Sequence, residues 1–76
     1  MYNENPDLDW TDVRSSCIES VKYDGGDMTL TVRFHSGNEY EYYPITRDEV
    51  DNLIKASSVG SYFNGNIKGT YQERKA

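Results

Sequence analysis

Apolar and polar residues alternate along the middle of the chain with the period of two that is typical of β-strands. The clearest run has four apolar positions separated by polar ones: Met28, Leu30, Val32 and Phe34. An earlier run has three apolar positions without strict alternation: Ile18, Val21 and Tyr23. This irregular spacing predicts a first strand that carries a bulge or a twist near Glu19.

A third run, residues 39–43, places Tyr40 and Tyr42 on one face of a strand. The strand should end at Pro44, which lacks the amide proton needed for the next ladder bond. The three runs are separated by two short turns that contain glycine, residues 24–27 and residues 36–38. Three consecutive strands with short turns predict an antiparallel meander.

Helical spacing replaces alternation after the third run. Thr46 and Glu49 form a capping-box pattern at a helix start, with the Thr46 hydroxyl as cap and the Glu49 carboxylate reaching back to the Thr46 amide. One helix face then carries Val50, Leu53 and Ile54, and a second short helix carries Val59, Tyr62, Phe63 and Ile67. We therefore predict an α+β fold, a three-stranded antiparallel β-meander followed by two short α-helices packed on one face.

The length of 76 residues allows one domain, and we expect three segments. Residues 1–12 are acidic and contain an Asn-Pro break, which indicates a flexible N-terminal arm. Residues 13–71 hold all the predicted elements, and residues 72–76 look like a frayed polar tail. Leucine, isoleucine, valine and phenylalanine are scarce, but 13% of the residues are aromatic, which favours a small folded domain over a disordered chain.

Charge and cysteine content exclude several classes of protein. A net charge of −5 is unusual for a dedicated nucleic-acid binder, although residues 52–76 are basic on balance. Cys17 and His35 are single residues of their types, which is too few for a zinc site or a disulfide framework. We expect no enzymatic activity, no metal and no cofactor. The sequence shows neither a signal peptide nor a membrane span, so we expect a cytoplasmic protein without membrane contact.

Tyrosine is the unusual feature of the composition, with seven residues. Aromatic side chains on a sheet face stack nucleic-acid bases, and nearby cations neutralise phosphates. The candidate residues for binding RNA or a nucleotide are Arg33, Tyr40, Tyr42, Tyr43, Tyr62, Asn64, Lys68 and Tyr71. The alternative is that tyrosine substitutes for scarce leucine and phenylalanine in a small core. Tyr43 is the tyrosine of this set that we expect to be exposed.

A second hypothesis assigns binding to the acidic half of the chain. Tryptophan is enriched in the residues that dominate protein interfaces, and carboxylates would attract a basic partner. The candidate residues for protein interaction are Trp10, Asp12, Glu39 and Glu41. Such a module would suit a phage-encoded inhibitor of a host factor. The alternative for Trp10 is a structural role, packed over the open end of the core. A third hypothesis is a homo-oligomeric protein that sequesters nucleotides.

The order of the motifs resembles the KTSC domain family, named after the C-terminus of certain lysyl-tRNA synthetases and found in small bacterial and phage proteins. The resemblance spans about residues 13–74 and rests on four segments: Ser15-Ser16-x-Ile18 with Tyr23-Asp24, Leu30-x-Val32-x-Phe34, Gly37-x-x-Tyr40-x-Tyr42 with Pro44, and Ser58-x-Gly60-x-Tyr62-Phe63-Asn64-x-x-Ile67-Lys68-x-x-Tyr71. Tyr43 stands where the family pattern usually has valine.

The resemblance implies a role in RNA binding, because of the synthetase connection, and makes RNA our favoured partner. It also draws attention to Asn64, whose amide lies within an apolar helical stretch. A buried amide needs a partner, so Asn64 should bond either a local backbone group or a ligand.

Overall fold

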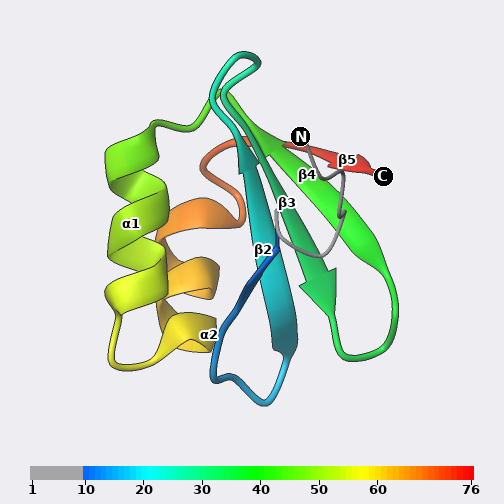
Figure 1. The fold of residues 1–76 in the computed structure, drawn as a ribbon, viewed down its shortest axis with the longest axis vertical. Helices are drawn as coiled ribbons and strands as arrows, with labels where there is room; N and C mark the ends of the chain where they lie inside the picture. Colours follow the sequence, from blue (N-terminus) through cyan, green and yellow to red (C-terminus); the bar gives the residue numbers. More distant parts are fainter. Residues whose placement is uncertain (1–9) are drawn as a thin grey trace, which may run out of the picture.

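The computed structural model describes residues 10–76 and contains one antiparallel sheet and two helical segments (Figure 1). In chain order the elements are β1 Thr11–Asp12, β2 Ile18–Asp24, β3 Thr29–Phe34, β4 Glu39–Tyr43, α1 Arg47–Lys55, α2 Val59–Tyr62, the π-helical turn η2 Phe63–Ile67, and β5 Gln72–Lys75. The sheet has the strand order β1-β2-β3-β4-β5. Figure 1 shows both helical segments on one side of the sheet.

The predicted meander forms the centre of the sheet, but the expected number of three strands is too small. β5 pairs with β4 from Tyr43↔Gln72 to Tyr40↔Lys75, so the tail that we expected to be frayed is an edge strand. All four residues of β5 are exposed, and a strand without apolar positions has no alternation that a sequence pattern can reveal.

β1 is the other edge and pairs with β2, with Thr11 opposite Val21 and Asp12 opposite Ser20. These two residues belong to the segment that we expected to be a flexible arm, so its end at least is ordered. The rest of that predicted arm, residues 1–9, lies outside the described residues.

The predicted bulge in the first strand is confirmed. The register between β2 and β3 shifts between Ile18 and Ser20, which leaves Glu19 without a partner on β3. Because a bulge adds one residue, Ile18 and Val21 both face the helices although they are three positions apart.

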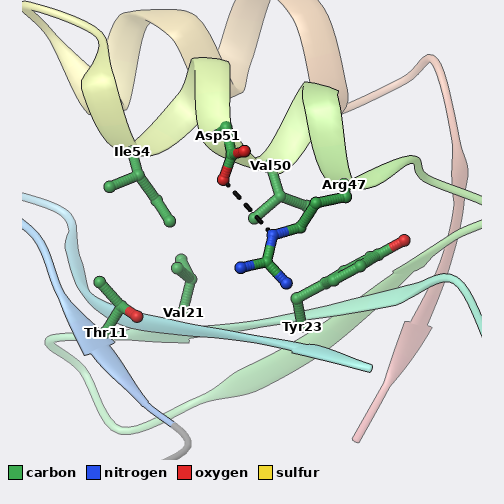
Figure 2. A pocket seen from close by; sticks show the side chains of 7 residues that line it. All are labelled: Thr11, Val21, Tyr23, Arg47, Val50, Asp51 and Ile54. Carbon is green, nitrogen blue, oxygen red and sulfur yellow. Dashed lines mark ion pairs between the residues drawn. The ribbon is translucent and has the colours of Figure 1, made fainter. Parts of the chain in front are cut away.

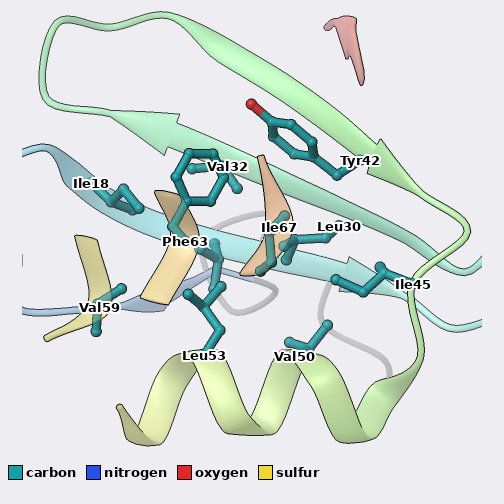
Figure 3. Packing of buried hydrophobic residues seen from close by; sticks show 11 residues of the cluster. Ile18, Leu30, Val32, Tyr42, Ile45, Val50, Leu53, Val59, Phe63 and Ile67 are labelled. Atoms are coloured by element: carbon teal, nitrogen blue, oxygen red, sulfur yellow. The ribbon is translucent and has the colours of Figure 1, made fainter. Parts of the chain in front are cut away.

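The core lies between the sheet and the helices, as Figure 3 shows. Leu30 and Val32, from the clearest alternating run, are completely buried. The Phe63 ring meets the Tyr42 ring edge-on, with the centroids 5.2 Å apart, and the Phe34 ring at 5.7 Å. Such edge-to-face pairs add to the stability gained from burial. The complete buried cluster is Ile18, Val21, Leu30, Val32, Tyr42, Ile45, Val50, Leu53, Val59, Phe63 and Ile67.

The helical segments differ from the prediction in two details. The Thr46 hydroxyl accepts the Glu49 amide at 3.3 Å, but the Glu49 carboxylate accepts the Tyr62 hydroxyl at 2.8 Å instead of reaching back to Thr46. The second helix is α-helical only over α2 and continues as the π-turn η2, in which the Lys68 amide bonds the Phe63 carbonyl. The Tyr62–Glu49 bond thus ties the second helical segment to α1. None of the helices formed by residues 10–76 is long and apolar enough to cross a membrane.

Candidate interaction face on the open side of the sheet

The side of the sheet opposite the helices, which we call the outer face, collects aromatic and charged residues from every strand. Successive residues of a strand point to opposite sides, so the neighbours of the core residues point outward. The aromatic and charged residues of the outer face are Trp10, Asp12, Lys22, Arg33, Glu39, Glu41, Tyr43 and Arg74.

Trp10 lies over two cations of the neighbouring strands. The guanidinium carbon of Arg33 is 4.0 Å from the centre of the indole ring, and the Lys22 ammonium is 5.0 Å from it. Arg33 Nε also donates a hydrogen bond to Glu39 Oε2 at 2.9 Å, across the β3–β4 pair. An arginine held between a carboxylate and an aromatic ring loses much of its rotamer freedom, so this part of the face is pre-organised.

A second stack of the same kind lies at the β4–β5 edge. The guanidinium carbon of Arg74 is 4.9 Å from the centre of the Tyr43 ring, and Arg74 Nε donates to Glu41 Oε1 at 2.8 Å. The hydrogen bond to Glu41 and the negative charge of Glu41 raise the pKa of Arg74 above its ordinary value. Both stacks therefore present an aromatic ring, a guanidinium and a carboxylate on one surface.

The formal charges of the outer face cancel. Arg33 and Arg74 each form an ion pair with a glutamate, and the single charges of Lys22 and Asp12 are equal and opposite. A surface with as many carboxylates as cations offers little long-range attraction to a polyanion. The protein as a whole, with a net charge of −5, repels one.

The residues that we predicted for nucleic-acid binding do not form one surface. Tyr42 is buried in the core, and Tyr40 packs on the same side against Phe34. Tyr62 and Tyr71 pack against the core from the helical side. This division follows from the alternation of β4, which sends Tyr40 and Tyr42 inward, so the core interpretation of these tyrosines holds.

The four remaining predicted residues are divided between the two sides of the molecule. Arg33 and Tyr43 belong to the outer face, whereas Lys68 is exposed beyond the end of η2 on the helical side. Asn64 is exposed in η2, so its side-chain amide can bond water and does not need the protein or ligand partner that a buried amide would need. Within residues 10–76 the candidate residues for binding RNA or a nucleotide therefore do not form one continuous surface.

The four residues predicted for protein interaction, in contrast, all lie on the outer face: Trp10, Asp12, Glu39 and Glu41. Sequence reasoning missed Lys22 and Arg74 as their partners. Lys22 lies between two inward-facing residues of β2, so the alternation of the strand was enough to predict that its side chain points outward. Arg74 could not be placed because its strand has no recognisable pattern.

Tyr42 donates its hydroxyl proton to Glu73 Oε2 at 2.7 Å and so links the core to the edge strand β5. Burial raises the pKa of Tyr42, and the hydrogen bond and charge of Glu73 raise it further. The hydrogen bond to Glu49 is the main cause that raises the pKa of Tyr62. Both phenols are therefore held in their neutral form.

We expect the native protein to lose stability as the pH rises above about 10, the ordinary pKa of tyrosine. Below that pH the phenols are neutral in both states, so the contribution of their hydrogen bonds to the Glu73 and Glu49 carboxylates is fully present. Above it the unfolded tyrosines ionise before the folded ones, which favours unfolding. Tyr42→Phe should cost about 1 kcal/mol at neutral pH and should weaken this alkaline loss. Urea unfolding at several pH values measures both effects, and an unchanged pH profile in Tyr42→Phe would contradict the assignment.

The cavity between α1 and the β1–β2 edge does not offer a ligand site. Its volume is about 120 Å³, whereas ligand pockets usually measure about 300–1,000 Å³. Figure 2 shows the Arg47 guanidinium inside it, 6.0 Å from the centre of the Tyr23 ring and with Arg47 Nε 3.5 Å from Asp51. Over residues 10–76, histidine, cysteine and carboxylate side chains do not gather in a group of three that could hold a metal ion.

The structure defines the class of the protein as a small α+β domain, a five-stranded antiparallel sheet with two short helical segments on one face. The sequence model of the KTSC domain matches residues 14–71, and the chain belongs to the KTSC domain family. The resemblance found in the sequence motifs is thereby confirmed over nearly its whole predicted span.

Three similar proteins illustrate where the domain occurs. A KTSC domain protein from Yersinia pestis has a solved structure that superposes with a TM-score of 0.82 at 34% identity, covering 88% of this chain and 94% of that one. A protein of Tsukamurella paurometabola is 37% identical over 60 residues, which are 79% of this chain and 90% of its own length. A lysine–tRNA ligase of Nostoc punctiforme is 37% identical over 57 residues, which are 75% of this chain but 10% of the ligase.

Proposed function

We propose that this protein is a protein-interaction module whose outer face docks a partner protein with a basic surface. The observation that carries the proposal is the pair of aromatic–arginine stacks, Trp10 with Arg33 and Tyr43 with Arg74. Tryptophan, tyrosine and arginine are the residue types that most often dominate binding energy at protein interfaces. Here four residues of these types share the outer face, and Figure 1 shows the helices on the other side of the sheet.

The charge of the chain supports a basic partner. At long range the net charge of −5 attracts a positively charged protein and increases the rate at which the two proteins meet. At short range the carboxylates Glu39 and Glu41 are held in fixed positions by their arginines, ready to accept hydrogen bonds from lysine or arginine of the partner. The ordered side chains lose little entropy on binding.

Trp10→Ala should reduce the affinity for such a partner by about 30-fold, the effect of losing one dominant interface residue. The experiment immobilises the full-length chain, passes nuclease-treated lysate of the source cells over it and identifies retained proteins by mass spectrometry. Lys68→Ala is the control, because it removes an exposed side chain on the helical side of the molecule.

The proposal requires basic proteins that the wild type and Lys68→Ala retain and that Trp10→Ala loses. Equal retention by all three chains would refute the outer face as the docking surface, provided that circular dichroism shows Trp10→Ala to be folded. The nuclease ensures that nucleic acid does not bridge the chain and the retained protein.

Single-stranded RNA binding is the second candidate, because a segment similar to this chain occurs within lysine–tRNA ligases. On this structure the bases would stack on Trp10 and Tyr43, and Lys22 with Arg33 would meet the phosphates. Fluorescence anisotropy of labelled single-stranded RNA at low and moderate salt distinguishes the two functions. RNA binding predicts an affinity that falls with salt by about 0.7 logarithmic units per phosphate contact and is lost in Trp10→Ala, whereas the protein-interaction function predicts no binding at moderate salt.

A further inference from the structure

A cleft of about 390 Å³ lies apart from the outer face, between the loop before β2 and the start of α2. In Figure 1 these two segments approach each other at the lower end of the molecule. The volume is within the range of small-molecule sites, and hydroxyl groups dominate the lining. The cleft is lined by Arg14, Ser15, Ser16, Cys17, Ser57, Ser58, Val59, Gly60, Ser61 and Asn64.

Two of the serines are fixed so that their hydroxyl protons remain free to donate. Ser15 Oγ accepts the backbone amides of Cys17 and Ile18, each at 3.1 Å, and Ser58 Oγ accepts the Ser61 amide at 3.3 Å. A hydroxyl oxygen that already accepts hydrogen bonds from backbone amides keeps its own proton free to donate to another group. The walls of the cleft therefore present hydrogen-bond donors.

Gly60 lets the two walls come close together. A Cβ atom at this position would lie 3.3 Å from Ser15 Oγ, tighter than an ordinary van der Waals contact. The donors of the loop before β2 and those of α2 can therefore act on the same small group.

The charge of the cleft contrasts with that of the whole chain. Arg14 is the charged residue of the lining, and none of the lining residues is a carboxylate. In a protein with a net charge of −5, a concave site with a guanidinium, serine hydroxyls and the Asn64 amide is complementary to an anion.

We propose that this cleft binds the phosphate group of a small phosphate monoester. A phosphate monoester carries nearly two negative charges and three terminal oxygens, which can use many donors at once. A carboxylate offers two oxygens and one charge and would leave most of the donors without a partner. The Arg14 fork matches the phosphate geometry, and the volume of the cleft leaves room for the organic part of the ester.

Amide chemical shifts of the full-length chain, titrated with glycerol phosphate at constant ionic strength, test this site. We expect saturable shifts at residues 14–17 and 57–64. Arg14→Gln should raise the dissociation constant about tenfold, because it removes a charge-assisted contact, and Ser57→Ala should raise it by a smaller factor. Lys68→Gln is the matched control, since it removes one exposed positive charge outside the cleft and should change nothing.

Equal weakening by Arg14→Gln and Lys68→Gln would show general charge screening and overturn the proposal. Acetate that produces the same shifts with the same affinity would overturn the phosphate class, and shifts outside the cleft would overturn the location. Arg14 and Ser57 are exposed, so both variants should retain the dispersed spectrum of the native fold. Because the cleft and the outer face share no residue, failure here leaves the protein-interaction function untouched.

Discussion

Leu30→Ala should lower the free energy of unfolding by about 2–5 kcal/mol and leave much of the protein unfolded at room temperature. Leu30 is completely buried on the central strand β3, and its removal leaves a cavity between the sheet and the helices. A domain of this size has little stability to lose. Thermal and urea unfolding followed by circular dichroism measure the effect.

Thr29→Ala is the control for this prediction. Thr29 is the preceding residue of the same strand and is half-buried on the opposite side, so its truncation should cost less than about 1 kcal/mol. A Leu30→Ala protein that unfolds at the same urea concentration as Thr29→Ala would contradict the register of β3.

Deletion of residues 72–76 should lower the free energy of unfolding by about 2–3 kcal/mol. The deletion removes the backbone ladder between β4 and β5, the hydrogen bond from Tyr42 to Glu73 and the ion pair between Arg74 and Glu41. A neutral backbone hydrogen bond contributes about 1 kcal/mol net, the bond to the Glu73 carboxylate contributes more and the exposed ion pair less. The conformational entropy that the strand loses when it is ordered offsets much of this sum. The same urea experiment compares the shortened chain with the full-length protein.

Glu73→Gln separates the side-chain contribution from the backbone ladder in the full-length chain. It keeps the strand but weakens the bond to Tyr42, so it should cost about 1 kcal/mol or less. If the deletion costs no more than a few tenths of a kcal/mol, the segment is a frayed tail in solution and β5 is not a stable strand.

The strands β2–β4 and the start of α1 were predictable because each has a local signal. Alternation around Leu30 and Val32 marks β3, the irregular spacing before Val21 marks the bulge, and Thr46 marks the helix cap. Each of these signals depends only on residues that are close together in the sequence, so a short segment is enough to recognise it.

The edge strands and the composition of the binding faces depend on partners far along the chain. β5 is held by β4, and its own residues, including Arg74, are exposed and polar. The serines of the cleft belong to two segments that lie far apart in the sequence. Ser15 and Ser58 do cap local amides, but only the fold brings the loop before β2 next to α2.

The tyrosines show why residue type alone did not define a site. The sequence allowed Tyr42 to be either a base-stacking residue or a core residue, and its position on β4 decided for the core. Tyr43, the next residue, points the other way and contributes to the outer face. A difference of one position in register exchanges the two roles.

Chemical-shift mapping locates the docking surface of a protein partner on the chain. A partner retained by the wild type is purified and added to the isotope-labelled full-length chain. We expect the Trp10 indole and the amides of β2–β5 around Arg33, Tyr43 and Arg74 to shift or broaden, while those of α1 and the serine cleft stay unchanged. Shifts confined to the helical side would refute docking at the outer face.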